Sequence, residues 1–205
     1  MIKKQIYPKT TRYANGERFV IITEKLDGSN CCFFRRENEL YVAQRSNIIN
    51  ITRELEESKK LLYKGMYGWL VEHGDELLNR LNENSVICGE WLGMGQIGYD
   101  DKQFDKRFYM FAKANIDEEL NLTRINYTHD YFIYPFSEQE IPEFIGIVPI
   151  VKILAEYPTR EFLDALYNDY TLFTDRKVEG FVINNNNSIK KYVRLKNGKL
   201  TEHKE

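Results

Sequence analysis

Short runs of strand-forming residues, interrupted by only a few helical patterns, place the strongest constraint on how this chain can fold. Each run is rich in β-branched, apolar or aromatic residues, as in FVIITE, and is bounded by turn residues. Because strands and helices do not alternate regularly, the pattern predicts an α+β fold with mostly antiparallel sheets. The predicted strands are 19–24, two strands within 30–45 joined by a turn at Glu37-Asn38, 86–91, 108–112, 178–183 and 189–195.

Three helical patterns lie between these strands. Asn50 is predicted to cap the first, and Thr159 is predicted to cap the third, over residues 160–168. Gly74 lies within the second pattern as a candidate interruption. Apolar residues recur at helical spacing in all three: Ile51, Leu55 and Leu62 with Ser58, then Leu70, Leu77, Leu78 and Leu81, then Leu163, Leu166, Tyr167 and Tyr170.

A chain of 205 residues can bury one sizeable core, so a single domain over residues 1–205 is expected. Hydrophobic residues make up 42% and aromatic residues 14% of the sequence, a balance that excludes a disordered chain. No run of about 18 consecutive apolar residues occurs, and the first residues lack the apolar stretch of a secretory signal. The sequence therefore predicts a folded cytoplasmic protein without membrane contact.

A net charge of -2 argues against a uniformly basic surface for nucleic acid, but basic residues are concentrated near the end of the chain. By itself, this concentration fits a solvated edge strand as well as a phosphate-binding strand. The residues are Lys190, Lys191, Arg194, Lys196 and Lys199.

The three cysteines are Cys31, Cys32 and Cys88. Adjacent cysteines on a strand point to opposite faces of the sheet, and an odd number of cysteines cannot all be paired. The sequence therefore predicts neither a disulfide framework nor a zinc site.

The segment EKLDGSN, from Glu24 to Asn30, follows a predicted strand and contains the sharpest candidate for chemistry, Lys25. A lysine is a nucleophile only when its amine is neutral, which burial or nearby positive charge favours by lowering the pKa. Asp27-Gly28 is also a good turn pair, so this segment alone favours an ordinary turn.

Six motifs taken together change that interpretation. They are EKLDGSN, AQRS around Arg45, CGEW around Glu90, RFYMFA around Phe111, KVEGFVI around Glu179 and YVRLKNGK around Lys196. In this order and spacing, the sequence resembles the covalent nucleotidyltransferase superfamily, and within it the ATP-dependent RNA ligases, along nearly its whole length. The resemblance implies an ATP-grasp-like nucleotidyltransferase core of mostly antiparallel sheets flanked by helices, without an appended C-terminal domain.

The resemblance also implies a role for each matching residue. Lys25 would attack the α-phosphate of ATP and carry AMP, with Mg²⁺ or Mn²⁺ as the cofactor. Glu179 would hold the metal and, with Lys196, complete the catalytic set; Glu90 would bind ribose, and Phe111 would stack on adenine with Tyr109 as an alternate. The remaining residues expected to bind ATP are Glu24, Asp27, Asn30, Arg45, Arg194 and Lys196.

The function implied is the joining of a 3′-hydroxyl to a 5′-phosphate on RNA through lysyl-AMP and an RNA-adenylate. Asn30 stands where DNA ligases and capping enzymes usually carry arginine, which favours RNA ends as the partner. In the last motif, Arg194 and Lys196 replace the usual pair of lysines, and Lys191 is an alternative to Arg194. The alternatives are a DNA ligase or capping-type enzyme and a catalytically silent binding module. A further protein that strengthens RNA binding is also expected.

Overall fold

The computed structural model describes residues 11–12, 18–99, 104–127, 135–136, 140–185, 188–196 and 199–200, with the backbone alone at 11–12, 18–19, 195–196 and 199–200. The chain forms two compact units. The first unit contains Gly28–Gly95 and Tyr99–Ile147, and the second contains Lys9–Asp27, Gln96–Gly98 and Val148–Glu205. The chain thus changes unit between Asp27 and Gly28, within the lysine motif. The expectation of a single domain stays a prediction.

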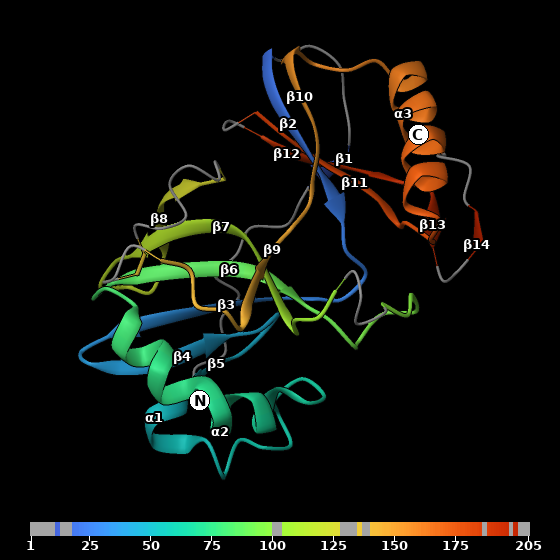
Figure 1. Ribbon diagram of the computed structural model, residues 1–205. Coiled ribbons are helices and arrows are strands. Elements are labelled where there is room, and N and C mark those ends of the chain that lie inside the picture. The colour runs from blue at the N-terminus through green and yellow to red at the C-terminus, as the bar shows by residue number, and fades with distance from the viewer. Residues whose placement is uncertain are drawn as a thin grey trace. The chain divides into compact units, whose positions relative to one another are not determined.

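A seven-stranded sheet forms the first unit (Figure 1). Its strands lie in the order β5-β4-β3-β6-β7-β8, and β9 pairs in parallel with β7 while the other neighbours are antiparallel. The predicted turn between β3 and β4 is confirmed, because Glu37 and Asn38 have φ of 53° and 58°, as a tight hairpin turn requires. The strands are β3 (Ser29–Arg36), β4 (Glu39–Ala43), β5 (Ile48–Asn50), β6 (Ser85–Trp91), β7 (Phe108–Ile116), β8 (Leu122–Asn126) and β9 (Ile145–Ile147).

Helices α1 (Ile51–Glu54) and α2 (Met66–Arg80) contribute apolar side chains to the core of the first unit. The side chain of Asn50 accepts a hydrogen bond from the backbone N–H of Arg53 at 3.1 Å, which confirms the predicted cap. The first helix ends at Glu54, short of the predicted pattern. Gly74 does not interrupt α2, because it is buried inside a continuous helix.

The core of the first unit is rich in aromatic side chains. Trp69 of α2 meets Trp91 of β6 edge to face, with ring centroids 5.5 Å apart. Phe33 of β3 lies 5.3 Å from the Trp69 ring and 5.0 Å from Phe108 of β7. These contacts join α2 to three neighbouring strands of the sheet.

A five-stranded sheet and helix α3 (Arg160–Thr174) form the second unit. The strands lie in the order β1-β12-β11-β2-β10, and only the β1–β12 pair is parallel. Leu163 and Tyr167 of α3 pack against Ile22 and Phe181 of the sheet. The strands are β1 (Thr11–Arg12), β2 (Arg18–Lys25), β10 (Ile150–Glu156), β11 (Gly180–Asn184) and β12 (Ile189–Val193), followed by the two-stranded pair β13 (Leu195–Lys196) and β14 (Lys199–Leu200).

The architecture confirms the predicted α+β fold with mostly antiparallel sheets. Thr159 caps α3, because its hydroxyl accepts from the Phe162 N–H at 3.2 Å, and the helix runs to Thr174, beyond the predicted end. Across the described part of the chain, none of the helices has the length and apolar character needed to cross a membrane.

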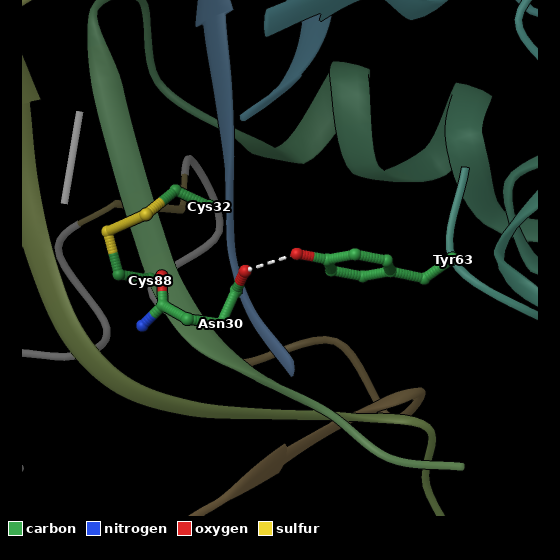
Figure 2. The surroundings of a disulfide bond; sticks show 4 residues. All are labelled: Asn30, Cys32, Tyr63 and Cys88. Atoms are coloured by element: carbon green, nitrogen blue, oxygen red, sulfur yellow. Dashed lines mark hydrogen bonds between the residues drawn. A yellow bond between two sulfur atoms is a disulfide. The ribbon is translucent and has the colours of Figure 1, made fainter. Parts of the chain in front are cut away.

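The structure corrects the prediction that the cysteines form no disulfide framework, because two of the three are paired. Cys32 of β3 lies directly opposite Cys88 of β6, with Cα atoms 4.1 Å apart, and the two form a disulfide (Figure 2). Cys31 points to the opposite face and is buried in the core, as alternation predicts. The pairing was missed because it depends on which strands are neighbours, and spacing along the sequence does not show this.

Reducing this disulfide is expected to destabilise the first unit. The bond closes a loop with a sequence separation of 56 residues, and a bond of this kind typically stabilises the folded state by about 2–4 kcal/mol. Urea unfolding followed by tryptophan fluorescence should therefore shift to lower urea when a thiol-free reductant is added. The Cys32→Ala/Cys88→Ala variant is the control and should not respond to the reductant. Superimposable wild-type curves with and without reductant would contradict the prediction.

Candidate functional site

Lys25 and Glu179 form the centre of the candidate site in the second unit. Lys25 is the last residue of β2, and Glu179 directly precedes β11, the strand that pairs with β2. The register places Gly180 opposite Lys25, so its neighbour Glu179 reaches the ammonium: Nζ lies 2.6 Å from Oε2. Both side chains are only partly exposed, 23% for Lys25 and 16% for Glu179. Two motifs 154 residues apart thus meet in one ion pair.

The environment of Glu179 raises its pKa above the ordinary value. Burial is the largest cause, and the negative charge of Asp27 acts in the same direction. The Lys25 ammonium and, more weakly, Lys191 act in the opposite direction. Desolvation thus outweighs the attraction of the lysine, so this carboxylate gains much from any further cation that approaches it.

Gly180 makes the close approach of β11 and β12 possible. A Cβ atom at this position would lie 1.9 Å from the backbone oxygen of Tyr192, and the backbone has φ of 156°. Any side chain here must push the two strands apart, directly beside Glu179.

We expect Gly180→Ala to lower the free energy of unfolding by at least about 2–3 kcal/mol, because the added methyl group meets backbone atoms that cannot move aside. Thermal unfolding followed by far-ultraviolet circular dichroism measures the loss. Gly98→Ala is the matched control in the same unit, since a Cβ there meets no atom within 4 Å. Equal melting temperatures for the two variants would show that the strands accommodate the methyl group.

Asp27 anchors the loop that follows β6 and contains Gln96 and Ile97. One carboxylate oxygen, Oδ2, accepts hydrogen bonds from the backbone N–H groups of Gln96 at 2.6 Å and Ile97 at 2.8 Å. All three residues belong to the second unit. The carboxylate of Asp27, two residues after Lys25 in the sequence, was assigned to ATP by the resemblance and thus also fixes this loop. Its ATP-binding role stays a prediction.

Glu24 points away from Lys25, into the layer between β2 and α3. Its side chain is fully buried at 0% exposure, and both of its oxygens pair with the guanidinium of Arg176. Tyr170 donates a third hydrogen bond to Oε2 at 2.8 Å. The protein itself thus supplies partners for both carboxylate oxygens, while the predicted contact with ATP stays untested.

Arg194 lies on the same side of the sheet as α3. Its Nη1 donates to Oδ1 of Asp164 at 2.6 Å, and its backbone N–H donates to the carbonyl of Glu179 at 2.8 Å. Lys191 of β12 is the alternative to Arg194 as the first basic residue of the last motif. Its positive charge acts to lower the pKa of Glu179. Lys196 belongs to β13, but its side chain lies outside the described part of the structure.

The first unit contains the other four candidates, Asn30, Arg45, Glu90 and Phe111. Asn30 of β3 lies opposite Glu90 of β6, which in turn lies opposite Tyr109 of β7, so these three share one face of the sheet. Oε1 of Glu90 accepts the N–H of Gly28 at 3.1 Å. This contact ties the end of the lysine motif to the motif around Glu90.

A β-bulge affects the two aromatic candidates. Cys88 pairs with Ala112 and Gly89 pairs with Met110, so the register shifts at Phe111. Regular alternation would place Phe111 and its alternate Tyr109 on one face of the strand, and the bulge interrupts that alternation. Tyr109 is buried and packs on Gly146, where a Cβ would lie 2.4 Å from its ring, whereas Phe111 is half-buried.

Tyr63 is a residue of the site region that sequence reasoning missed. Its hydroxyl donates to the carbonyl of Asn30 at 3.2 Å (Figure 2). The same hydroxyl accepts the N–H of Arg45 at 3.3 Å. It therefore links two of the motif residues through their backbones. Neither its neighbours in the sequence nor its spacing distinguishes it from other tyrosines. Arg176 was missed for the same reason, and Tyr170 was predicted only as part of an apolar stripe.

The described residues contain no cluster of three or more His, Cys, Asp or Glu side chains that could hold a metal by themselves. Glu179 nevertheless suits a hard divalent cation, since it is a carboxylate whose pKa is raised by burial and by Asp27. Magnesium is commonly held by one or two carboxylates together with phosphate oxygens of the substrate. The residues present therefore fit a metal that arrives with a nucleotide.

Comparison with known proteins supports these motifs. The family model described as RNA ligase matches residues 18–197. No curated protein sequence matches the chain. Among solved structures, three variants of the RNA ligase of Naegleria gruberi have similar folds. Two of them contain ATP and manganese, with TM-scores of 0.52 and 0.53 at 18% and 19% identity. The third is an apo form, with a TM-score of 0.54 at 18% identity.

These alignments cover 92–94% of this chain and 58% of each Naegleria chain, so the chain spans less than two thirds of the length of those structures. At this identity they establish the fold, and the match of the family model over residues 18–197 establishes the family. With the ion pair of Lys25 and Glu179 formed by two of the matching motifs, the chain belongs to the RNA ligase family.

Proposed function

We propose that this protein is an ATP-dependent RNA ligase in which Lys25 accepts AMP. The amine of Lys25 attacks the α-phosphate of ATP, a nitrogen–phosphorus bond forms, and pyrophosphate leaves. The AMP then passes to the 5′-phosphate of an RNA end, and the 3′-hydroxyl of another end attacks this RNA-adenylate and releases AMP. The observation that carries the proposal is the Lys25–Glu179 pair, at 2.6 Å, in a chain of the RNA ligase family.

The lysine must lose its proton before it attacks. In the structure its ammonium is neutralised by Glu179, so opening this pair is part of the chemistry that we propose. Two of the Naegleria structures contain ATP and manganese, which supports ATP as co-substrate and Mg²⁺ or Mn²⁺ as the metal here.

Glu179 would hold this cation together with phosphate oxygens of ATP. The bound cation would neutralise negative charge on the phosphates. With its carboxylate engaged in this way, Glu179 would no longer neutralise the Lys25 ammonium.

The remaining roles are proposals that rest on the motif matches. Glu90 would accept hydrogen bonds from ribose hydroxyls, Phe111 would stack on adenine, and Arg45 would contact phosphates. The ATP-binding roles of Asn30 and Lys196 rest on the motif matches as well. The selection of RNA ends is also a proposal, because the chain spans 58% of the Naegleria structures. The cytoplasmic location and the further RNA-binding protein stay predictions.

Two measurements test the function. Intact mass after incubation with ATP and Mg²⁺ should increase by one AMP, whereas a silent binding module would gain no covalent adduct. A panel of nicked RNA, nicked DNA and single strands, each with a 5′-phosphate, should then show sealing of RNA ends in preference to DNA. Preferential sealing of nicked DNA would favour a DNA ligase, and labelling by GTP in place of ATP would favour a capping-type enzyme.

A further inference from the structure

The residue directly before the nucleophile carries a buried negative charge that the mechanism above does not use. Glu24 has a fully buried carboxylate, and burying a charge is costly unless it is paired and hydrogen-bonded. Arg176 binds both oxygens in a fork, and Tyr170 adds a hydroxyl donor to one of them. Because both carboxylate oxygens have hydrogen-bond partners, the Glu24 side chain is held in one orientation.

The partners of Glu24 come from one end of α3. Tyr170 lies just before the last turn of this helix, and Arg176 follows its C-cap, Asp175, which has a left-handed φ of 50°. Burial raises the pKa of Tyr170, and the charge of Glu24 raises it further, so the hydroxyl keeps the proton that it donates. Arg176 is always charged at physiological pH. At physiological pH, Arg176 therefore keeps its positive charge and Tyr170 keeps the hydroxyl proton that it donates to Glu24.

Holding Glu24 also fixes the backbone from which Lys25 projects. Side chains alternate along a strand, so Glu24 faces Phe181 and the α3 layer while Lys25 faces the opposite side of the sheet. The backbone N–H of Glu24 donates to the carbonyl of Pro149 at 2.9 Å. Beyond Lys25 the strand ends, so Glu24 is the last residue of β2 with an inward-facing side chain.

We propose that Arg176 and Tyr170 are positioning residues that act through Glu24 to set the direction of attack by Lys25. This inference rests on the proposed function, because it concerns the step in which Lys25 takes AMP from ATP. In-line attack on phosphorus requires the amine to lie close to the phosphate and opposite pyrophosphate, and a misplacement of about 1 Å costs roughly a hundredfold in rate. In this proposal the network acts through Glu24 and the backbone of β2, without contact to the reacting atoms.

Lysyl-AMP formation, which uses Lys25 as the nucleophile, can be measured separately from sealing. In sealing, the nucleophile is the 3′-hydroxyl of the RNA. Arg176→Gln, Arg176→Lys and Tyr170→Phe are compared with wild type in two assays. One measures the rate of lysyl-AMP formation as a function of ATP in a single turnover. The other supplies RNA already carrying a 5′-adenylate and measures sealing. Tyr41→Phe is the matched control, since Tyr41 also donates to a carboxylate, Glu39, but in the first unit.

The expected result is a loss confined to adenylation. Arg176→Gln should slow lysyl-AMP formation about 10- to 100-fold, with Tyr170→Phe less affected and Arg176→Lys restoring part of the rate. The ATP concentration for half-saturation and the sealing of pre-adenylated RNA should each change less than about threefold, since ATP binding and the last step do not require the direction of Lys25. Glu24→Gln/Arg176→Gln should be no slower than Glu24→Gln alone if Arg176 acts only through Glu24.

Other outcomes overturn the inference. Equal losses in adenylation and in sealing of pre-adenylated RNA would show a general structural role, and a change in half-saturation alone would show that Glu24 binds ATP. If Arg176→Gln does not fold, Tyr170→Phe decides, because it keeps both charges. A wild-type protein that forms no lysyl-AMP would contradict the proposed function instead, so the two failures are distinguishable.

Discussion

Lys25→Ala is expected to abolish the covalent AMP adduct, because the amine that forms the bond to phosphorus is gone. After incubation with ATP and Mg²⁺, the wild-type mass should increase by one AMP and the variant mass should not change. Sealing of RNA ends that carry only a 5′-phosphate should be lost as well, since no AMP reaches the RNA. This is the largest effect that we expect from a single substitution.

The Lys25→Arg variant tests whether Lys25 acts as a nucleophile or only supplies a positive charge. Arginine keeps the positive charge beside Glu179 but is effectively never deprotonated, so it should also form no adduct. Lys152→Ala is the matched control, because Lys152 is an exposed lysine of the same unit, on β10. Undiminished labelling in Lys25→Ala, or a labelled peptide that contains another lysine, would refute the assignment.

Glu179→Ala and Glu179→Gln are expected to slow lysyl-AMP formation about a hundredfold or more. Stabilising charge through a bound cation contributes several kcal/mol in metal-assisted reactions, and each 1.4 kcal/mol corresponds to a tenfold change in rate. The Mg²⁺ concentration needed for half-maximal adenylation should rise in both variants. Glu156→Ala, which removes an exposed carboxylate from β10 of the same unit, should leave both quantities unchanged.

The stability of Glu179→Gln should not fall with its activity. The pKa of Glu179 is raised in the folded state, so folding is disfavoured by ionisation as the pH rises from the ordinary glutamate value, about 4.3, through the raised value. Glutamine cannot ionise, so the variant should be at least as stable as wild type at neutral pH, and the difference should vanish below pH of about 4. The lost attraction to Lys25 is already included in this balance, because the pKa of Glu179 is raised despite that attraction. Normal adenylation, or a melting temperature well below that of wild type, would contradict a metal-binding role.

The sequence predicted the local features of this fold well. Helix caps depend on residues a few positions apart, and both Asn50 and Thr159 cap as expected. The turn at Glu37-Asn38 and the strands with strong β-branched character were predicted for the same reason. The missed strands include β5 and β9, each only three residues long, and β10, whose apolar Ile150 and Ile153 are exposed and do not follow strict alternation.

The sequence motifs predicted individual residues of the candidate site but not the contacts between them. Lys25 and Glu179 were chosen from separate motifs, and the register of β2 with β11 explains why they meet. Partnerships that depend on register left no signal in the sequence. The disulfide of Cys32 and Cys88 arises in this way, whereas the pairing of Glu24 with Arg176 depends on how the end of α3 packs on the sheet. The roles assigned to the individual residues stay predictions until they are measured.

Both tryptophans of the chain, Trp69 and Trp91, pack against each other in the core of the first unit. Intrinsic tryptophan emission is therefore a local probe, which reports the first unit and is blind to the second. Destabilisation by Gly180→Ala or Tyr170→Phe can leave this emission unchanged while calorimetry or circular dichroism records it. Conversely, an emission transition that precedes the calorimetric one would mean that the two units melt separately, and that no single melting temperature describes the chain.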